Sequence, residues 1–183
     1  GEAIFSCSIS FQKREKGLSH QIKMPDIPGP ENLKSDFELR KDVQDKIPKD
    51  YLPMWLRERE IETRQVEPMD LLKAEKLPPY RSTWMKPTGK LPSDERIHQA
   101  LLLYVSDMGL LGAAVNPHEV NFMSKKFQSA SLDHVMWFHG KVNFNNWVLH
   151  HMHSPISSGA RGFSRGSIYT KSGKLIASTA QEG

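Results

Sequence analysis

The stretch Asp94–Gly112, which reads DERIHQALLLYVSDMGLLG, decides the fold. Its apolar side chains recur at helical spacing, and further leucines extend the apolar surface around most of the helix. Ser93 can cap the start of the helix, and Asp94 and Glu95 lie in the first turn, where the helix dipole favours negative charge. A helix that is apolar on nearly all sides is usually buried on all sides. We therefore predict a buried central helix around which the rest of the chain is arranged.

Asp107 is the residue of this stretch that does not fit an apolar helix. It lies at the edge of the apolar stripe and near the C-terminal end, where the helix dipole disfavours negative charge. A carboxylate close to a core needs hydrogen-bond partners, because burying it unpaired is costly. The pattern leaves two interpretations open, a functional carboxylate and a capping residue at the solvent edge.

Segments typical of strands lie on both sides of the helix. Strict alternation predicts a half-buried strand over residues 2–12, with Cys7 on its apolar face as a core thiol. The other predicted strands cover residues 60–67, 80–86, 129–139, 147–153, 163–169 and 175–181. The last two are joined as a hairpin through residues 171–174. Successive strands with short connections should be largely antiparallel, so we expect an α+β fold in which an antiparallel sheet wraps around one long helix.

Between the first strand and the rest, the chain changes character. Pro25, Pro28 and Pro30 exclude regular structure and indicate a linker. Residues 33–46 can form a polar surface helix within it.

Composition limits the class of protein. Of the 183 residues, 38% are hydrophobic and 25% are charged, which is typical of a globular domain. The net charge of +4 comes without a basic run interleaved with aromatic residues, so we expect no nucleic-acid partner. No apolar run approaches the roughly 20 residues of a membrane span. The single cysteine fits a reducing, intracellular compartment.

Two groups of polar residues suggest chemistry that the spacing does not support. Ser131 to His134 contain Ser, Asp and His, but neighbouring residues on a strand point to opposite faces, so no local relay forms. His150, His151 and His153 suggest metal, yet no third ligand on the face of His151 and His153 is identifiable. Packing histidines are favoured, and we expect neither a metal nor a cofactor.

Several motifs together resemble a known family. They are Arg96-Ile-His-Gln99, Tyr104-Val-Ser-Asp107, Ser131-Leu-Asp-His-Val-Met-Trp-Phe-His139, Arg161-Gly-Phe163, Arg165-Gly166 and Ala180-Gln-Glu-Gly183. The chain is similar to the C-terminal half of the acyl-CoA thioesterase II family, and the similarity covers nearly its whole length. The resemblance implies a double hotdog, in which each of two halves curls a sheet around a long helix. Residues 1–23 would then be the last strand of the first hotdog, 24–58 a linker, and 59–183 the second hotdog domain.

The resemblance also implies an activity. The family hydrolyses medium- and long-chain fatty acyl-CoA to free acid and CoA, with a water activated by Asp, Ser or Thr, and Gln. On this chain these residues are Asp107, Ser131 and Gln181. A thioester hydrolase needs a group that takes a proton from water and groups that position the water, and these residue types suit both tasks. The family implies the cytoplasm of a bacterium or the peroxisome of a eukaryote.

Departures from the family pattern leave alternatives open. The first hotdog is absent apart from its last strand, although the acyl-chain tunnel of the family lies against that half. The chain alone is then either inactive or paired with another copy, and we expect homo-oligomers through contacts between hotdogs. A non-catalytic acyl-CoA-binding or oligomerisation module is the alternative function. A hotdog hydratase is disfavoured because the helix and its approach lack the matching Asp-to-His spacing.

Overall fold

A computed structural model describes residues 1–70, 72–120 and 127–183 of the chain. The described residues form a six-stranded antiparallel sheet in the order β1-β2-β4-β5-β6-β3. Its strands are β1 (Ile61–Gln65), β2 (Tyr80–Pro87), β3 (Val135–Phe138), β4 (Val148–Ser158), β5 (Arg161–Thr170) and β6 (Leu175–Glu182). The predicted antiparallel sheet is confirmed, and so is the hairpin, since β5 and β6 pair across residues 171–174.

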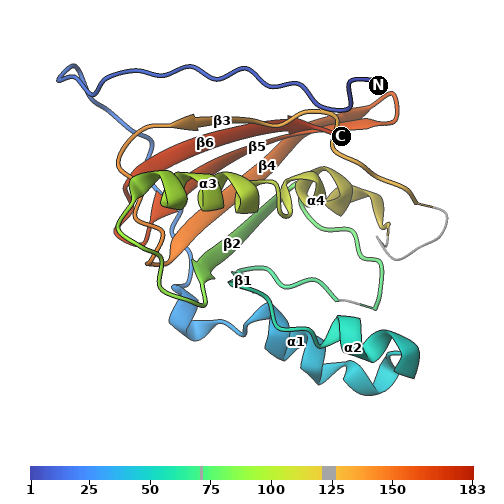
Figure 1. The fold of residues 1–183 in the computed structure, drawn as a ribbon. Coiled ribbons are helices and arrows are strands. Elements are labelled where there is room, and N and C mark those ends of the chain that lie inside the picture. The colour runs from blue at the N-terminus through green and yellow to red at the C-terminus, as the bar shows by residue number, and fades with distance from the viewer. Residues whose placement is uncertain (71, 121–126) are drawn as a thin grey trace.

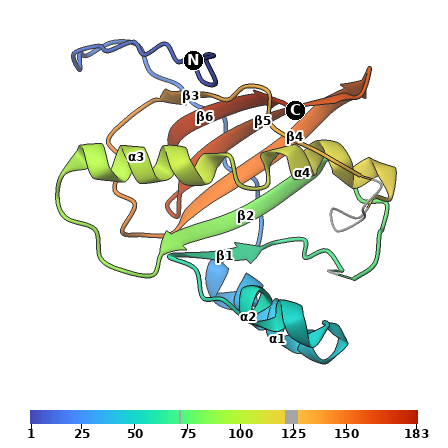
Figure 2. The ribbon, with the colours of Figure 1, turned by 45° about the vertical axis from the view of Figure 1, so that its right-hand side comes forward.

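The central helix lies across one face of the curved sheet (Figures 1 and 2). It is divided into α3 (Glu95–Ser106) and α4 (Leu110–Val115) rather than continuous. Gly109 separates the two with a left-handed φ of 85°, a conformation that favours glycine. The main core cluster joins α3 to the strands and consists of Ile61, Met85, Leu102, Val105, Val142, Phe144, Val148, Ile168, Ile176 and Ala177.

The prediction that this helix is buried on all sides is wrong. One side of α3 faces the sheet, and Leu102 and Val105 there are fully buried. On the other side Leu103 is 44% exposed and Tyr104 is 65% exposed, although both are apolar or aromatic. The described residues supply one sheet, and one sheet covers one side of a helix. The sequence therefore carries more apolar surface than this chain buries.

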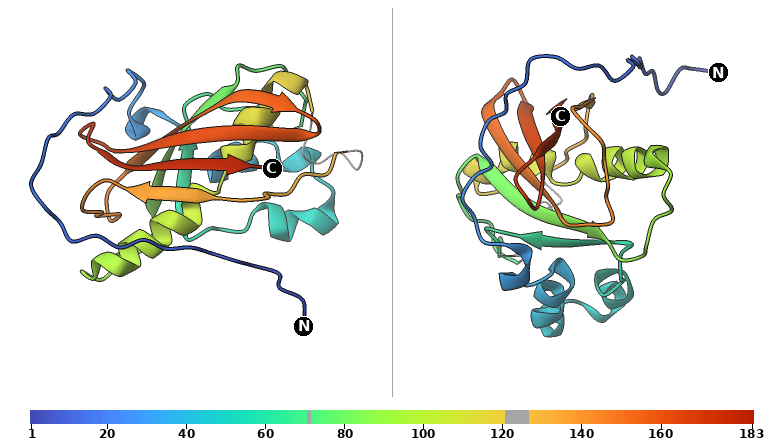
Figure 3. Two further views of the ribbon diagram at one scale, coloured as in Figure 1. Left: turned by 90° about the horizontal axis from the view of Figure 1, so that it is seen from above. Right: turned by 90° about the vertical axis from the view of Figure 1, so that its left-hand side faces the viewer.

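The strand predicted over residues 2–12 is also wrong in this chain. Residues 1–23, all of which the structure describes, form an extended segment that is nearly all exposed and joins no strand (Figure 3). Phe5 is 80% exposed, and Cys7 is an exposed free thiol rather than a core thiol. A strand needs a neighbour that accepts its backbone hydrogen bonds, and alternation alone does not supply one. The assignment of residues 1–23 to another domain stays a prediction.

The linker packs against the β1 edge of the sheet. It contains α1 (Asp36–Asp42), α2 (Leu52–Trp55) and the 3-10 turns Pro30–Asn32, Gln44–Lys46 and Lys49–Tyr51. A further 3-10 turn, Asn116–His118, follows α4. The helix predicted over residues 33–46 is thus shorter than expected.

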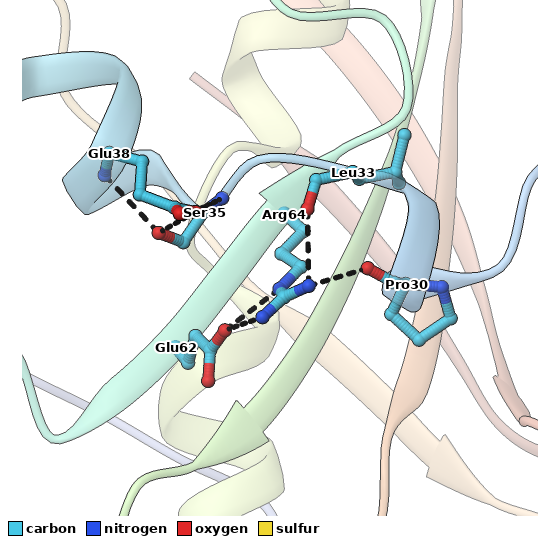
Figure 4. A network of polar contacts seen from close by, with 6 residues as sticks. All are labelled: Pro30, Leu33, Ser35, Glu38, Glu62 and Arg64. Atoms are coloured by element: carbon cyan, nitrogen blue, oxygen red, sulfur yellow. Dashed lines mark hydrogen bonds and ion pairs between the residues drawn. The ribbon is translucent and has the colours of Figure 1, made fainter. Parts of the chain in front are cut away.

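Figure 4 shows one set of contacts within the linker and one set between the linker and β1. Ser35 and Glu38 form a capping box at the start of α1. Arg64 on β1 donates hydrogen bonds to the carbonyl oxygens of Pro30 at 2.7 Å and Leu33 at 3.1 Å, and it pairs with Glu62 at 2.6 Å. The β1 edge is therefore covered by the chain itself.

The strand at the opposite edge of the sheet, β3, is shorter than predicted. A strand was expected over residues 129–139, and the ladder with β6 covers only Val135–Phe138. Before it, the amide of Leu132 donates to the carbonyl oxygen of Glu182 at 2.9 Å, while the Asp133 carboxylate accepts from the amide of Glu182 at 2.8 Å. These contacts take residues 131–134 out of the regular ladder, so their side chains do not alternate between two faces.

By length and composition alone, one helical stretch of the described part of the chain could cross a membrane. It is Glu95–His118, with a mean hydropathy of 1.3 in its most apolar window. The indication is weak, because half of that window is buried within the protein and core helices pass the same test.

Candidate active site

The three residues implied by the family resemblance meet at the junction of α3 and α4. Asp107 is the C-cap of α3, Ser131 lies in the loop before β3, and Gln181 is on β6. They are brought together across 24 and 74 residues of sequence. The structure therefore places all three side chains in one site, while their catalytic role stays a prediction.

A closed set of hydrogen bonds joins the three side chains. Gln181 Nε2 donates to Asp107 Oδ1 at 2.7 Å, and Ser131 Oγ donates to the same oxygen at 3.2 Å. Gln181 Nε2 also contacts Ser131 Oγ directly. These donors offset the unfavourable position of a carboxylate at a helix C-terminus. Both bonds end on Oδ1, and among the described residues no hydrogen bond to Oδ2 is found.

Burial differs within the trio. Gln181 is 2% exposed, whereas Asp107 and Ser131 are exposed in this chain. The site therefore has a buried floor and an open side. The carboxylate of Asp107 and the hydroxyl of Ser131 lie on the open side, and the Gln181 amide lies beneath them.

Sequence reasoning missed two residues that extend this network. His134 Nδ1 lies 3.0 Å from Gln181 Oε1, and His134 Nε2 lies 2.8 Å from Ser106 Oγ. A regular strand over residues 131–134 would point Asp133 and His134 to opposite faces, and the chain does not form a strand there. The signal that could have found these residues was their spacing, since Ser106 precedes Asp107 and His134 follows Ser131 by three positions.

Beneath the trio, the inner face of the sheet is polar. His150 on β4 is fully buried, and its Nε2 lies 3.2 Å from Thr179 Oγ1 on β6. Burial lowers the pKa of His150 from 6.5 to about 3, with smaller contributions from the charges of His134 and His151. His150 is therefore neutral at physiological pH.

The three histidines of β4 do not converge on one point. His150 faces the core, whereas His151 points the other way, and its Nδ1 lies 3.0 Å from Ser82 Oγ. Burial lowers the pKa of His151, and the charge of His153 adds to this shift. Among the described residues no group of three potential metal ligands is found.

Comparisons with known proteins agree with the fold. A family model described as acyl-CoA thioesterase matches residues 55–183. Acyl-CoA thioesterase 2 of Haemophilus influenzae is 36% identical over 176 residues, which cover 96% of this chain and 62% of that protein.

Two solved structures are similar to the fold. The acyl-CoA thioesterase II TesB2 from Mycobacterium marinum is 30% identical, with a TM-score of 0.70 over 93% of this chain and 58% of that chain. A protein of unknown function with a hotdog fold from Alicyclobacillus acidocaldarius is 16% identical, with a TM-score of 0.53 over 93% of this chain and 57% of that chain, and it shows the fold alone. The predicted hotdog fold is confirmed.

The chain spans about 60% of the length of these relatives, since it covers 62% of the Haemophilus protein and 58% of the Mycobacterium chain. The family model nevertheless matches most of the chain, and the Haemophilus relative covers almost all of it. By these matches the chain belongs to the acyl-CoA thioesterase II family.

Proposed function

We propose that this chain carries the catalytic residues of a hydrolase that converts medium- and long-chain fatty acyl-CoA to free fatty acid and CoA. The observation that supports the proposal is the contact of the Gln181 amide with both Asp107 and Ser131. Neither Ser131 nor Gln181 is adjacent to Asp107 in sequence. A carboxylate held by an amide and a hydroxyl, with one oxygen left open, is suited to orient and deprotonate a water molecule.

The chemistry follows from these groups. The water oxygen forms a bond to the thioester carbonyl carbon while the Asp107 carboxylate takes a proton from the water. The C–S bond then breaks, the acyl group leaves as the carboxylic acid, and the sulfur of CoA departs as a thiolate. Ser131 and Gln181 hold the carboxylate in position through their hydrogen bonds to Oδ1.

The test replaces Asp107 with asparagine in the full-length protein. Asp107→Asn keeps the size of the side chain and removes the proton acceptor, so kcat for release of CoA from palmitoyl-CoA should fall by about 100-fold or more. Asp94→Asn is the matched control. Asp94, rather than the expected Ser93, is the N-cap of α3, so the change alters an acid at the other end of the helix, and asparagine also caps helices well. Turnover by Asp107→Asn equal to that of the control would remove Asp107 from the mechanism.

The exposed apolar surface beside the site favours a role in association as well. We call this surface the open face, and it consists of Ile97, Leu103, Tyr104, Met108, Leu132, Val135, Trp137 and Phe138, each at least 36% exposed. These residues come from α3, from the turn just after it (Met108), and from β3 with the loop before it. α3 and β3 run along the same edge of the molecule (Figures 1 and 2). Edge strands with unpaired backbone groups and apolar side chains favour pairing with another chain. We propose that a second copy covers the open face.

Light scattering after size-exclusion chromatography tests this pairing. The unaltered chain should elute as a dimer or a larger oligomer, and the double change Leu103→Glu with Trp137→Lys should give a monomer. Tyr51→Lys is the control, because Tyr51 is 56% exposed on the linker, away from the open face. A monomeric unaltered chain would refute pairing between copies. Binding of acyl-CoA without hydrolysis would instead support a non-catalytic module.

The proposed location is intracellular, in the bacterial cytoplasm or the eukaryotic peroxisome. Fractionation of cells that contain the full-length protein tests this, and recovery from the culture medium would contradict it.

A further inference from the structure

We propose that His134 is a positioning residue that fixes the orientation of the Gln181 carboxamide, and that Ser106 holds the His134 ring in place. The proposal rests on the function proposed for Asp107, Ser131 and Gln181. It adds a second layer of residues that do not touch the reacting atoms.

Gln181 can serve the site in only one of its two orientations. The nitrogen and oxygen ends of an amide have nearly the same shape, but one donates hydrogen bonds and the other accepts them. With Nε2 toward Asp107 at 2.7 Å, the amide donates to the carboxylate. A rotation of 180° would place Oε1 against the same carboxylate, where two acceptors repel each other. The site therefore needs something that holds the amide in the first orientation.

His134 meets the other end of the amide. Its Nδ1 lies 3.0 Å from Gln181 Oε1, within hydrogen-bond distance. Because Oε1 can only accept, this contact is favourable only if Nδ1 carries a hydrogen. An N–H at this position would also repel the amide NH2 group of the reversed orientation. Asp107 and His134 thus favour the same orientation of Gln181 from its two ends.

Ser106 can pair with the His134 ring when Nδ1 carries the hydrogen that Gln181 Oε1 requires. Ser106 Oγ lies 2.8 Å from the carbonyl oxygen of Leu103 and 2.8 Å from His134 Nε2, and a hydroxyl has one hydrogen to donate. With a neutral ring protonated at Nδ1, Ser106 donates to Nε2. With a doubly protonated ring, Nε2 donates to Ser106, which donates to Leu103. Both arrangements keep the hydrogen on Nδ1 and the same orientation of Gln181.

The contacts close a ring on the helix. Ser106 and Asp107 are neighbours at the end of α3, His134 joins Ser106 to Gln181, and Gln181 returns to Asp107. Ser106 is 0% exposed and Gln181 is 2% exposed, so water competes little for these groups. The orientation of the amide is therefore determined by protein groups at both ends.

Two substitutions of His134 test the roles of its two ring nitrogens separately. The side-chain nitrogen of His134→Asn takes nearly the place of Nδ1, so it keeps the donor to Gln181 and loses the contact with Ser106. The nitrogen of His134→Gln takes nearly the place of Nε2, so it keeps the Ser106 contact and loses the donor to Gln181. A purely structural role would make the two variants fail alike.

The kinetic measurement uses the full-length protein with palmitoyl-CoA. We expect His134→Gln to lower kcat by about tenfold or more with little change in KM, and His134→Asn to stay within about threefold of the unaltered enzyme. Equal kcat for the two variants would overturn the proposal, whether both values are high or both are low.

A spectroscopic measurement separates this proposal from the proposed function. In 15N-labelled protein, the Gln181 side-chain amide signal is identified by its loss in Gln181→Glu. It should keep its chemical shift and slow hydrogen exchange in His134→Asn, and move toward values of a free amide in His134→Gln. An unmoved signal in His134→Gln would overturn the positioning role. If the unaltered protein fails to hydrolyse acyl-CoA, the proposed function fails and this measurement still tests the orientation of Gln181.

Discussion

The space between the helix and the sheet has an apolar end and a polar end, built from the same three strands. At the apolar end the packed side chains are Leu102, Val105, Val148, Ile168 and Ala177. Two positions further along β4, β5 and β6, the inward-facing residues are His150, Gly166 and Thr179. Every second residue of a strand faces the same side, and His150 pairs with Ile168 while Gly166 pairs with Thr179, so the hydrogen-bonding groups begin in the same row as the last apolar residues.

The two ends contribute differently to the free energy of folding. The apolar end removes hydrocarbon from water and needs no partners. The polar end lies below the end of α3, next to Gln181, and its groups must find hydrogen bonds. Among the described residues, His150 Nδ1 and Ser164 Oγ are buried and lack a partner. The polar end therefore contributes less to the stability of the fold than the apolar end.

The largest expected effect tests the apolar end. Leu102 is fully buried in the main cluster, so Leu102→Ala should lower the free energy of unfolding by about 3 kcal/mol. Urea denaturation at pH 7 measures this. Since Leu102 does not contact the trio in the described network, kcat below the melting temperature should change little. A loss of kcat without a loss of stability would contradict the view that the apolar end stabilises the fold without affecting the site.

A smaller effect is expected from added volume at the polar end. A methyl group on Gly166 would overlap His150 Nε2 and Thr179 Oγ1, and the His150 ring is fully enclosed. Gly166→Ala should therefore cost about 2 kcal/mol in urea denaturation.

Gly140→Ala is the matched control, because a methyl group there meets only the end of Lys174 at 3.7 Å. If both variants were equally stable, the polar end would be looser than the contacts indicate.

The smallest effect is a pH dependence that comes from His150. Its pKa is 6.5 in the unfolded chain and about 3 in the folded one, so the unfolded state binds more protons between these values. The stability is complete above pH 6.5 and is lost as the pH falls below it, by about 1 kcal/mol between pH 7 and 5.5. Urea midpoints at the two pH values measure this. His150→Gln should remove that part of the slope, and an unchanged slope would show that another group causes it.

Much of the fold could be predicted from sequence because its signals are local. The helical spacing in residues 94–112 and the alternation in later strands identified the elements of the sheet. The exposure of Leu103 and Tyr104 could not be predicted, because burial depends on what lies opposite the helix. The same reason explains residues 2–12, whose alternation is typical of a strand while the described chain offers no strand to pair with.

The candidate site was harder to predict than the fold. Asp107 could be singled out as an acid on an apolar helix, whereas Ser131 and Gln181 were identified only through resemblance to a family. Their contact depends on register between β6 and a loop far away in sequence. The contact of His134 with Gln181 could not be predicted, because residues 131–134 lie outside the strand ladder and periodicity does not indicate where a chain leaves a ladder.

The left-handed turn at Gly109 marks the end of α3, and the length of α3 determines the direction in which Asp107 points. A helix advances about 100° per residue, so one residue added to or removed from α3 would swing the Asp107 carboxylate about a quarter turn away from Gln181. A change further along, after Gly109, leaves that angle as it is. Insertions that preserve the arrangement of the site are therefore expected in the connecting loops, and designers who lengthen this domain should leave α3 at its present twelve residues.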